Sequence, residues 1–105
     1  MTQSELLQRI KERLQALYGP RYRGLVLYGS VARGDADEES DIDLLCLLNG
    51  PVNMIKEIGP LIDATSDLNY AYLDRVFSIK AVDVADFEEG AYPLCIEARR
   101  EGVPV

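Results

Sequence analysis

Two short stretches decide the fold of this chain: residues 28–34 read YGSVARG, and residues 40–45 read SDIDLL. The first follows an apolar run that predicts a buried strand, so Gly29 falls where a strand gives way to a helix. Free backbone amides at such a turn can hold a phosphate. In the second stretch, Asp41 and Asp43 open another apolar run, and strand geometry puts both carboxylates on one face, roughly 6.6 Å apart.

Two oxygen ligands on a strand suit Mg²⁺, which needs few protein ligands beyond the phosphates that it bridges. The two stretches together therefore suggest metal-assisted handling of a nucleoside triphosphate. A Walker A loop is excluded because Asp35 stands where the phosphate-binding lysine must be. An EF-hand is excluded because Ser40 and Cys46 replace its required glycine and glutamate.

A solvated acidic loop over residues 35–43 is the alternative explanation for any single acid in that segment. Asp41 and Asp43 differ from the other acids because Ile42 and Leu44 already belong to the expected strand. Aspartate is disfavoured in strands unless another interaction compensates. This pair is therefore expected to face a site.

The pattern Gly-Ser, ten residues, then Asp-x-Asp resembles the signature of the minimal nucleotidyltransferases, small members of the DNA polymerase beta-like nucleotidyltransferase superfamily. The matching residues are Gly29, Ser30, Ala32, Arg33, Gly34, Ser40, Asp41, Ile42, Asp43 and Leu44. Such proteins are commonly the antitoxin of a bacterial or archaeal pair whose toxin is a HEPN-domain ribonuclease. The resemblance implies transfer of AMP from Mg-ATP, in some cases onto a tyrosine of that toxin.

The resemblance also implies roles for individual residues. Asp41 and Asp43 would be the catalytic carboxylates and would hold one Mg²⁺ ion or two, while an acceptor hydroxyl attacks the α-phosphorus of ATP and pyrophosphate leaves. Arg33 would either neutralise phosphate charge or tether the acidic loop, and both roles stay open. The nucleotide-binding residues implied are Gly29, Ser30, Arg33 and Gly34.

The expected strand over residues 75–82 departs from the family pattern, because the superfamily usually supplies a third carboxylate there. Ser78 holds that place in the expected register. Asp74 lies on the same side of the strand and could reach the metal, and Lys80 could contact phosphate. The general base is thus unassigned, so binding of Mg-ATP is better supported than fast transfer.

Length and composition predict one compact domain over residues 1–105. No apolar stretch approaches a membrane span and no signal peptide is visible, so a cytoplasmic location is expected. A net charge of −7 argues against gripping an extended nucleic acid. Histidine is absent from the sequence, which removes His-based relays, and Cys46 and Cys95 are expected to be reduced core residues.

Helical and strand patterns alternate along the chain, which predicts an α/β layer arrangement. The resemblance implies the same: a small mixed sheet flanked by helices, in the polymerase beta palm-like nucleotidyltransferase fold. Strands are expected at about 23–28, 42–48 and 75–82, with short helices near Ser30 and after Asp83 and a last helix at 93–100. Apolar residues at helical spacing are Leu6, Leu7, Ile10, Leu14 and Leu17 in a first helix that ends at Gly19-Pro20, and Ile55, Ile58, Leu61, Ile62 and Leu68 in a third, which Gly59-Pro60 bends or interrupts.

Two function classes stay open at this stage. The first is an enzyme that adenylylates a HEPN toxin partner, and the second is a catalytically weak nucleotide-binding antitoxin that neutralises its partner by stoichiometric occupancy. Transfer to a small molecule such as an aminoglycoside is a weaker third alternative. The sequence leaves the acceptor, the preferred nucleotide and the oligomeric state open.

Overall fold

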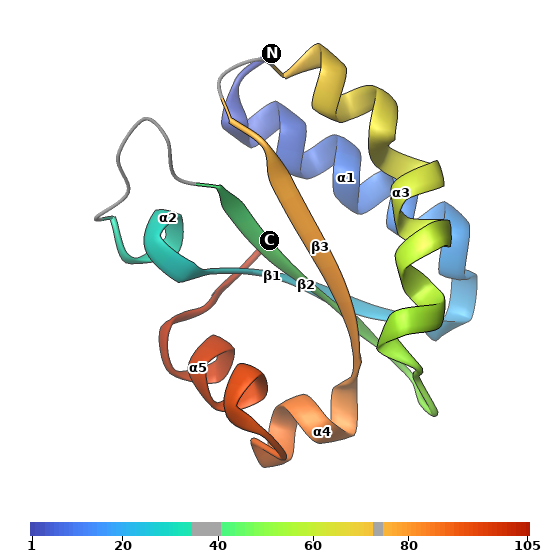
Figure 1. Cartoon of the computed structure of the whole chain (residues 1–105), viewed down its shortest axis with the longest axis vertical. Coiled ribbons are helices and arrows are strands. Elements are labelled where there is room, and N and C mark those ends of the chain that lie inside the picture. The colour runs from blue at the N-terminus through green and yellow to red at the C-terminus, as the bar shows by residue number, and fades with distance from the viewer. Residues whose placement is uncertain (35–40, 73–74) are drawn as a thin grey trace.

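The computed structural model describes residues 1–34, 41–72 and 75–105. Its sheet has the strand order β3-β2-β1-β4 (Figure 1). The strands are β1 (Tyr22–Tyr28), β2 (Ile42–Leu48), β3 (Phe77–Asp83) and β4 (Val103–Pro104). The strand β1 is antiparallel to both β2 and β4, whereas β2 and β3 are parallel. The predicted mixed α/β sheet is therefore confirmed.

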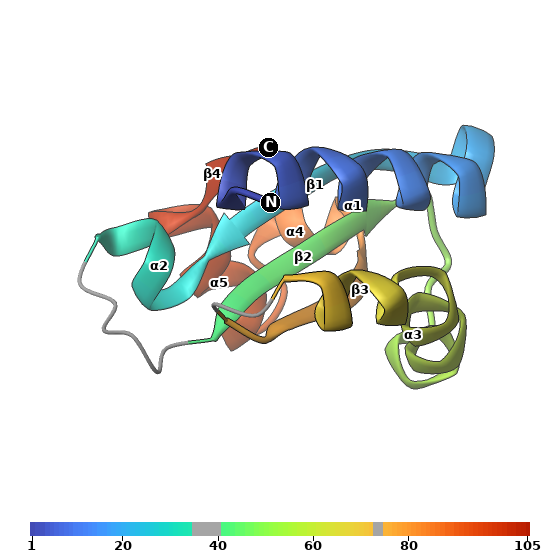
Figure 2. The same cartoon turned by 90° about the horizontal axis from the view of Figure 1, so that it is seen from above.

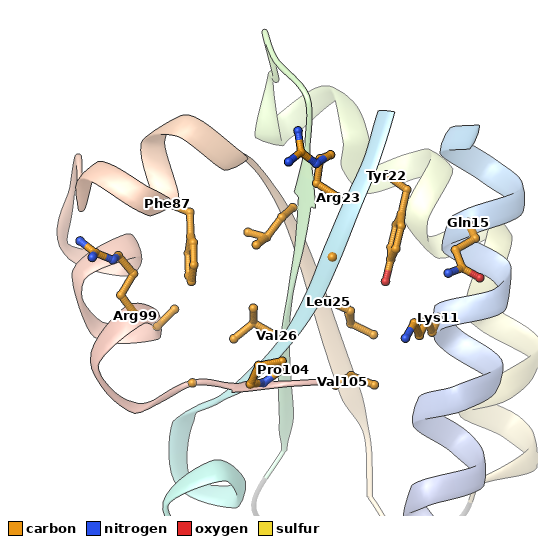
Figure 3. Close-up of a pocket in the computed structure, with 14 residues that line it drawn as sticks. Lys11, Gln15, Tyr22, Arg23, Leu25, Val26, Phe87, Arg99, Pro104 and Val105 are labelled. Atoms are coloured by element: carbon orange, nitrogen blue, oxygen red, sulfur yellow. The ribbon is translucent and has the colours of Figure 1, made fainter. Parts of the chain in front are cut away.

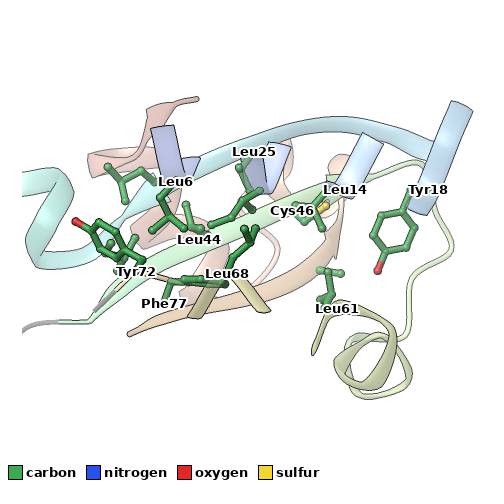
Figure 4. Close-up of a cluster of buried hydrophobic side chains, with 14 of the residues drawn as sticks. Leu6, Leu14, Tyr18, Leu25, Leu44, Cys46, Leu61, Leu68, Tyr72 and Phe77 are labelled. Carbon is green, nitrogen blue, oxygen red and sulfur yellow. The ribbon is translucent and has the colours of Figure 1, made fainter. Parts of the chain in front are cut away.

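Helices cover both faces of the sheet, because alternate residues of β1 and β2 are apolar on each side. On one face, α1 (Gln3–Tyr18) and α3 (Met54–Ala71) enclose the larger core cluster, which includes Leu14, Leu44, Cys46 and Leu61 (Figure 4). On the other face lie α4 (Val84–Glu89) and α5 (Pro93–Glu101). The short helix α2 (Gly29–Arg33) stands at the end of the sheet where β1 stops (Figure 2).

The first helix forms as its sequence predicts. The Thr2 hydroxyl accepts a hydrogen bond from the Glu5 amide at 3.1 Å, as in a capping box. Leu6, Ile10 and Leu14 are fully buried, but Leu17 is exposed and Tyr18 is buried in its place. Tyr18 follows Leu14 by one helical turn, so it continues the buried stripe, and a 3₁₀ turn η1 (Gly19–Arg21) then ends the helix.

Gly59-Pro60 is predicted to bend or interrupt the third helix, and the interruption does not occur, since α3 runs continuously with Pro60 inside it. Proline removes one backbone hydrogen bond, to the carbonyl of Lys56, but both residues are exposed and water can reach that carbonyl. Burial of Leu61 and Leu68 against the sheet holds the helix together across the proline.

The short strand β4 goes beyond what the sequence patterns indicate. The strand β4 has two residues, too short for any periodic signal, and pairs with Val26 and Leu27 of β1.

Both cysteines are buried free thiols, as expected. Among the described residues, no helix is both long and apolar enough to cross a membrane.

Candidate nucleotide site

The two halves of the sequence motif meet at the junction of β1 and α2. Gly29 is buried and has a φ of 78°. A Cβ atom built on Gly29 would overlap the carboxylate of Asp43 on the neighbouring strand β2. Glycine therefore serves two purposes at this position: it adopts the left-handed backbone, and it leaves room beside the carboxylate.

The register of the sheet places Asp43 between two neighbours. Asp43 pairs with Tyr28 on β1 and with Ser78 on β3, and it is half-buried. Burial raises the pKa of the Asp43 carboxyl above its ordinary value of 3.8; Lys80 and Arg33 lower that pKa, and Asp41 raises it. Lys80, Asp41 and Arg33 therefore lie close enough to Asp43 to change the pKa of its carboxyl.

Asp41 is exposed and lies directly before β2. No group of three or more His, Cys, Asp or Glu side chains in the described segments is arranged to hold a metal ion. The candidate protein ligands for a metal ion at this site are thus the two carboxylates of Asp41 and Asp43. Such a donor set fits Mg²⁺ when phosphate oxygens and water complete its octahedral shell.

Ser30 and Gly34 lie within and after α2. Ser30 is half-buried in the first turn of this helix, one residue after Gly29. Gly34 caps the helix with a φ of 78°, and its amide donates to the carbonyl of Val31 at 3.2 Å. Gly34 thus closes the C-terminal end of α2, and its part in nucleotide binding stays a prediction.

Arg33 forms an ion pair with Glu101 at the end of α5. Its Nη1 atom lies 3.1 Å from Oε1 and 3.0 Å from Oε2 of that carboxylate. The Arg33 guanidinium lowers the pKa of Glu101. Glu101 was not identified from the sequence, because it lies 68 positions from Arg33 and their pairing leaves no local signal in the sequence. The acidic loop that Arg33 was expected to contact, residues 35–40, lies outside the described residues.

On β3, Ser78 is exposed beside Asp43, and Lys80 is the register partner of Leu45. Both side chains belong to the face that carries Asp43, because residues of one parity share a face. Asp74, the other candidate for a third carboxylate, lies outside the described residues. Asp83 is at the far end of β3, where it caps α4.

Tyr28 was not singled out from the sequence. It is buried, and this burial, followed by Asp43 and Glu97, raises the pKa of its phenol to about 12. Its phenol therefore stays neutral at neutral pH, and its side chain belongs to the core cluster that includes Ala98 of α5. The strand pairing that brings Tyr28 to Asp43 has no signature in either segment alone.

A hollow of about 620 Å³ lies elsewhere, along β1 and its short partner β4 (Figure 3). Lys11, Arg23 and Arg99 are among its lining residues. None of the predicted site residues lines it. The candidate site is therefore the junction at Gly29 and Asp43, which the sequence motif identifies, and not the hollow along β1 and β4.

Comparison with known proteins defines the class of this chain. Residues 7–95 match the nucleotidyltransferase domain family, and the chain belongs to that family. The "putative protein adenylyltransferase MJ0141" of Methanocaldococcus jannaschii is 32% identical over 68 residues, which cover 65% of this chain and 68% of that protein. The predicted family and the enzyme class, nucleotidyltransferase, are thereby confirmed.

Solved structures agree with this assignment. A "putative minimal nucleotidyltransferase" superposes with a TM-score of 0.61 and 27% identity, covering 100% of this chain and 97% of the other. The complex of a tri-AMPylated HEPN toxin of Shewanella oneidensis with an MNT antitoxin gives a TM-score of 0.58 at 20% identity. That match covers 98% of this chain and 71% of the other. The nucleotidyltransferase fold is confirmed.

Proposed function

We propose that this chain binds Mg-ATP at the junction of Gly29 and Asp43 and transfers AMP to the hydroxyl group of a tyrosine in a HEPN-domain toxin. The observation that carries the proposal is the contact between the two halves of the motif. The carboxylate of Asp43 fills the space that a side chain at Gly29 would need. A phosphate approaching the Gly29 backbone is therefore brought directly to the carboxylates that would share its metal ion.

Each residue of the proposed site has a distinct task. Asp41 and Asp43 would hold Mg²⁺, which when bound neutralises phosphate charge and polarises the α-phosphorus. The Ser30 hydroxyl donates a hydrogen bond to a phosphate oxygen. Arg33 adds positive charge at the end of α2, although Glu101 now shares that charge. Two carboxylates next to a triphosphate would repel it without the cation, so binding should depend on magnesium.

In the proposed reaction, the acceptor oxygen forms a bond to the α-phosphorus of ATP. The bond from that phosphorus to the oxygen bridging to the β-phosphorus breaks, and pyrophosphate leaves with that oxygen. The hydroxyl proton passes either to Asp74 or to solvent. Ser78 cannot accept it as a base, because a neutral hydroxyl is far too weakly basic at neutral pH.

The HEPN partner is supported by the likeness of this fold to an MNT antitoxin solved with such a toxin. The net charge of −7 favours a basic protein surface over a nucleic acid backbone. The cytoplasmic location stays a prediction from the sequence.

A second candidate function is neutralisation of the partner by occupancy, with the nucleotide site as a weak or inactive remnant. The observation that favours it is the neutral Ser78 beside Asp43, at the place where a third acid is expected. In this alternative, the chain binds its partner in a fixed ratio and no AMP is transferred.

The decisive experiment incubates the chain with α-labelled ATP, Mg²⁺ and its HEPN-domain partner, and follows label on the partner by gel and mass spectrometry. The proposal expects label on a tyrosine, and none when EDTA is present or when Asp41 and Asp43 are both changed to asparagine. Stable complex formation without label would replace the transfer proposal with the occupancy function.

A further inference from the structure

A groove is lined by residues of α3 and β3. The strand β3 lies at one edge of the sheet (Figure 1). Within the described ranges, no strand pairs with the outer edge of β3. The Phe77 amide at the start of this edge already donates to the Asn69 side chain at 3.2 Å, so the backbone groups further along β3 are the ones open to a partner. The groove encloses about 470 Å³. It is an opening of the size and position that an extended segment needs.

The wall of the groove on α3 is apolar in its first half, whereas Thr65, Ser66 and Asn69 line the second half. Ile58 and Ile62 line the apolar half and are 49% and 57% exposed. Ile55 and Val76 are also exposed but do not line the groove. The sequence placed these isoleucines in one helical pattern with Leu61, but Leu61 is the one that is buried. An apolar surface of this kind on an acidic chain marks an interaction site.

The groove is continuous with the nucleotide site through β3. Phe77 and Ile79 pack against the core on the α3 side, whereas Ser78 and Lys80 belong to the face that carries Asp43. All four residues line the groove. A segment added along β3 would therefore point alternate side chains into the groove and onto the face of Asp43.

We propose that this groove docks the acceptor polypeptide of the proposed AMP transfer, on which this inference rests. An extended segment pairs with the open edge of β3, packs apolar side chains against Ile58 and Ile62, and directs an intervening tyrosine past Ser78 toward Asp43. Apolar residues thus flank the acceptor tyrosine directly on both sides.

Strand geometry explains why the acceptor is a tyrosine. The added strand lies two strand spacings from β2, or roughly 10 Å in all. A serine or threonine hydroxyl, one carbon from the backbone, stays over the added strand itself, whereas a tyrosine ring can extend across β3.

Charge in the groove adds a further preference. Of its ten lining residues, all of them described, Lys80 is the one with a charge. Lys80 lies two residues from Ser78 on the same face of β3. A carboxylate two positions from the acceptor tyrosine would face it, so the segment that fits has the pattern acid, apolar, tyrosine, apolar.

The test uses the full chain and two blocked peptides of equal composition. In one, valines flank a central tyrosine and glutamates stand one place further out; in the other, the valines and glutamates are exchanged. Amide NMR spectra should show shifts along residues 77–83 with the first peptide. The permuted peptide should bind at least about tenfold more weakly, which corresponds to 1.4 kcal/mol.

Variants locate the peptide. Ile62→Glu should weaken binding of the first peptide at least about tenfold. The matched control Ile96→Glu changes an isoleucine on α5 that is 53% exposed and outside the groove, and should leave binding unchanged. Circular dichroism checks the fold of each variant, and Ile58→Glu provides a second groove variant.

The results separate docking from catalysis, because peptide binding needs no ATP. Equal binding of both peptides, shifts confined to other surfaces, or unchanged binding by Ile62→Glu would each overturn the docking site. So would a free chain that sediments as a dimer with its β3 amides protected, because a second copy would then occupy the edge. Peptide bound as expected without AMP transfer in the partner assay would refute the proposed function and leave the groove a binding site.

Discussion

The Asp43 carboxylate lies in the space that a Cβ atom on Gly29 would occupy. Gly34 offers a natural comparison, since it also has a φ of 78° but nothing lies within 4 Å of the corresponding Cβ position. A side chain at Gly34 would thus strain the backbone alone. A side chain at Gly29 would strain the backbone and displace a proposed metal ligand.

Gly29→Ala and Gly34→Ala should therefore differ in nucleotide binding more than in stability. Each places a residue with a side chain in the left-handed region, at a cost of about 1–2 kcal/mol. We expect Gly29→Ala to weaken magnesium-dependent ATP binding at least about tenfold, and Gly34→Ala to weaken it less, because no proposed metal ligand is displaced there. Calorimetry and urea unfolding measure the two effects. Equal ATP affinity in both variants would place the phosphates elsewhere.

Ser30→Ala removes the hydroxyl proposed to hold a phosphate. Loss of one such hydrogen bond should weaken ATP binding by about 0.5–3 kcal/mol. Ser66→Ala on α3 is the matched control, because Ser66 is also a half-buried helical serine and lies at the groove instead of the nucleotide site. Titration calorimetry with Mg-ATP compares the two, and parental affinity in Ser30→Ala would remove the hydroxyl from the site.

Changing both Asp41 and Asp43 to asparagine should abolish magnesium-dependent ATP binding and preserve the fold, because neither side chain belongs to a core cluster. Circular dichroism and calorimetry test the two halves of this expectation. Undiminished magnesium-dependent binding would disprove the metal assignment. A collapse of the fold would show that the pair is structural.

Asp43 alone should also affect the pH dependence of stability. Its pKa is raised above 3.8 in the folded chain, chiefly by burial, so the folded state favours the protonated form. Stability from this group is then present below the unfolded pKa and is lost as pH rises through the folded pKa. Asp43→Asn should accordingly be more stable than the parent at neutral pH, and this gain should vanish near about pH 3. Urea unfolding of both proteins at the two pH values measures the difference.

Local signals made much of this molecule predictable. The Thr2 and Glu5 capping box, the apolar run of β2 and the glycine after β1 each act within a few residues, and each appears as expected. The two motif halves could be recognised as a pair, because their residue types and spacing carry the chemistry. Their contact at Gly29 and Asp43 follows from the antiparallel pairing of β1 and β2.

Long-range packing limited the rest. Ile58, Leu61 and Ile62 give one apolar pattern, and the pattern does not tell which of them the sheet covers. The pairing of β4 with β1 and the ion pair between Arg33 and Glu101 join segments far apart in the chain. Such contacts depend on the assembled fold, which no single segment encodes.

The Arg33–Glu101 ion pair leads to a test of the two roles considered for Arg33. If Arg33 serves the phosphates, Arg33→Ala should weaken ATP binding, whereas Glu101→Gln should keep or strengthen it by freeing the guanidinium from its carboxylate. Because Arg33 lowers the pKa of Glu101 below 4.5, stability from this pair is present above that value and is lost as pH falls through the folded pKa. Calorimetry measures the change in ATP affinity, and urea unfolding at several pH values measures the loss of stability. Weaker ATP binding by Glu101→Gln would instead mean that Glu101 positions Arg33 for the nucleotide.

Ser78 next to Asp43 provides the last prediction, which concerns the missing third acid. Since Ser78 is the register partner of Asp43 on the parallel strand β3, an aspartate there would place a third carboxylate beside the proposed metal ligands. Ser78→Asp should therefore raise magnesium affinity and AMP transfer, and a positioned base is worth about 10²–10⁴-fold in rate. Ser78→Asn is the matched control, with nearly the same shape and no charge.

Asp74→Asn distinguishes the remaining source of a base. If Ser78 marks a vacant place, this change should do little; if Asp74 reaches the metal, it should stop transfer outright. AMP incorporation into the HEPN partner, measured for all three variants beside the parent, separates these cases. A rise with Ser78→Asp but not with Ser78→Asn ties the gain to the charge, because the two side chains fill the same space beside Asp43. Transfer by neither parent nor variants would show that the chain neutralises its partner by occupancy.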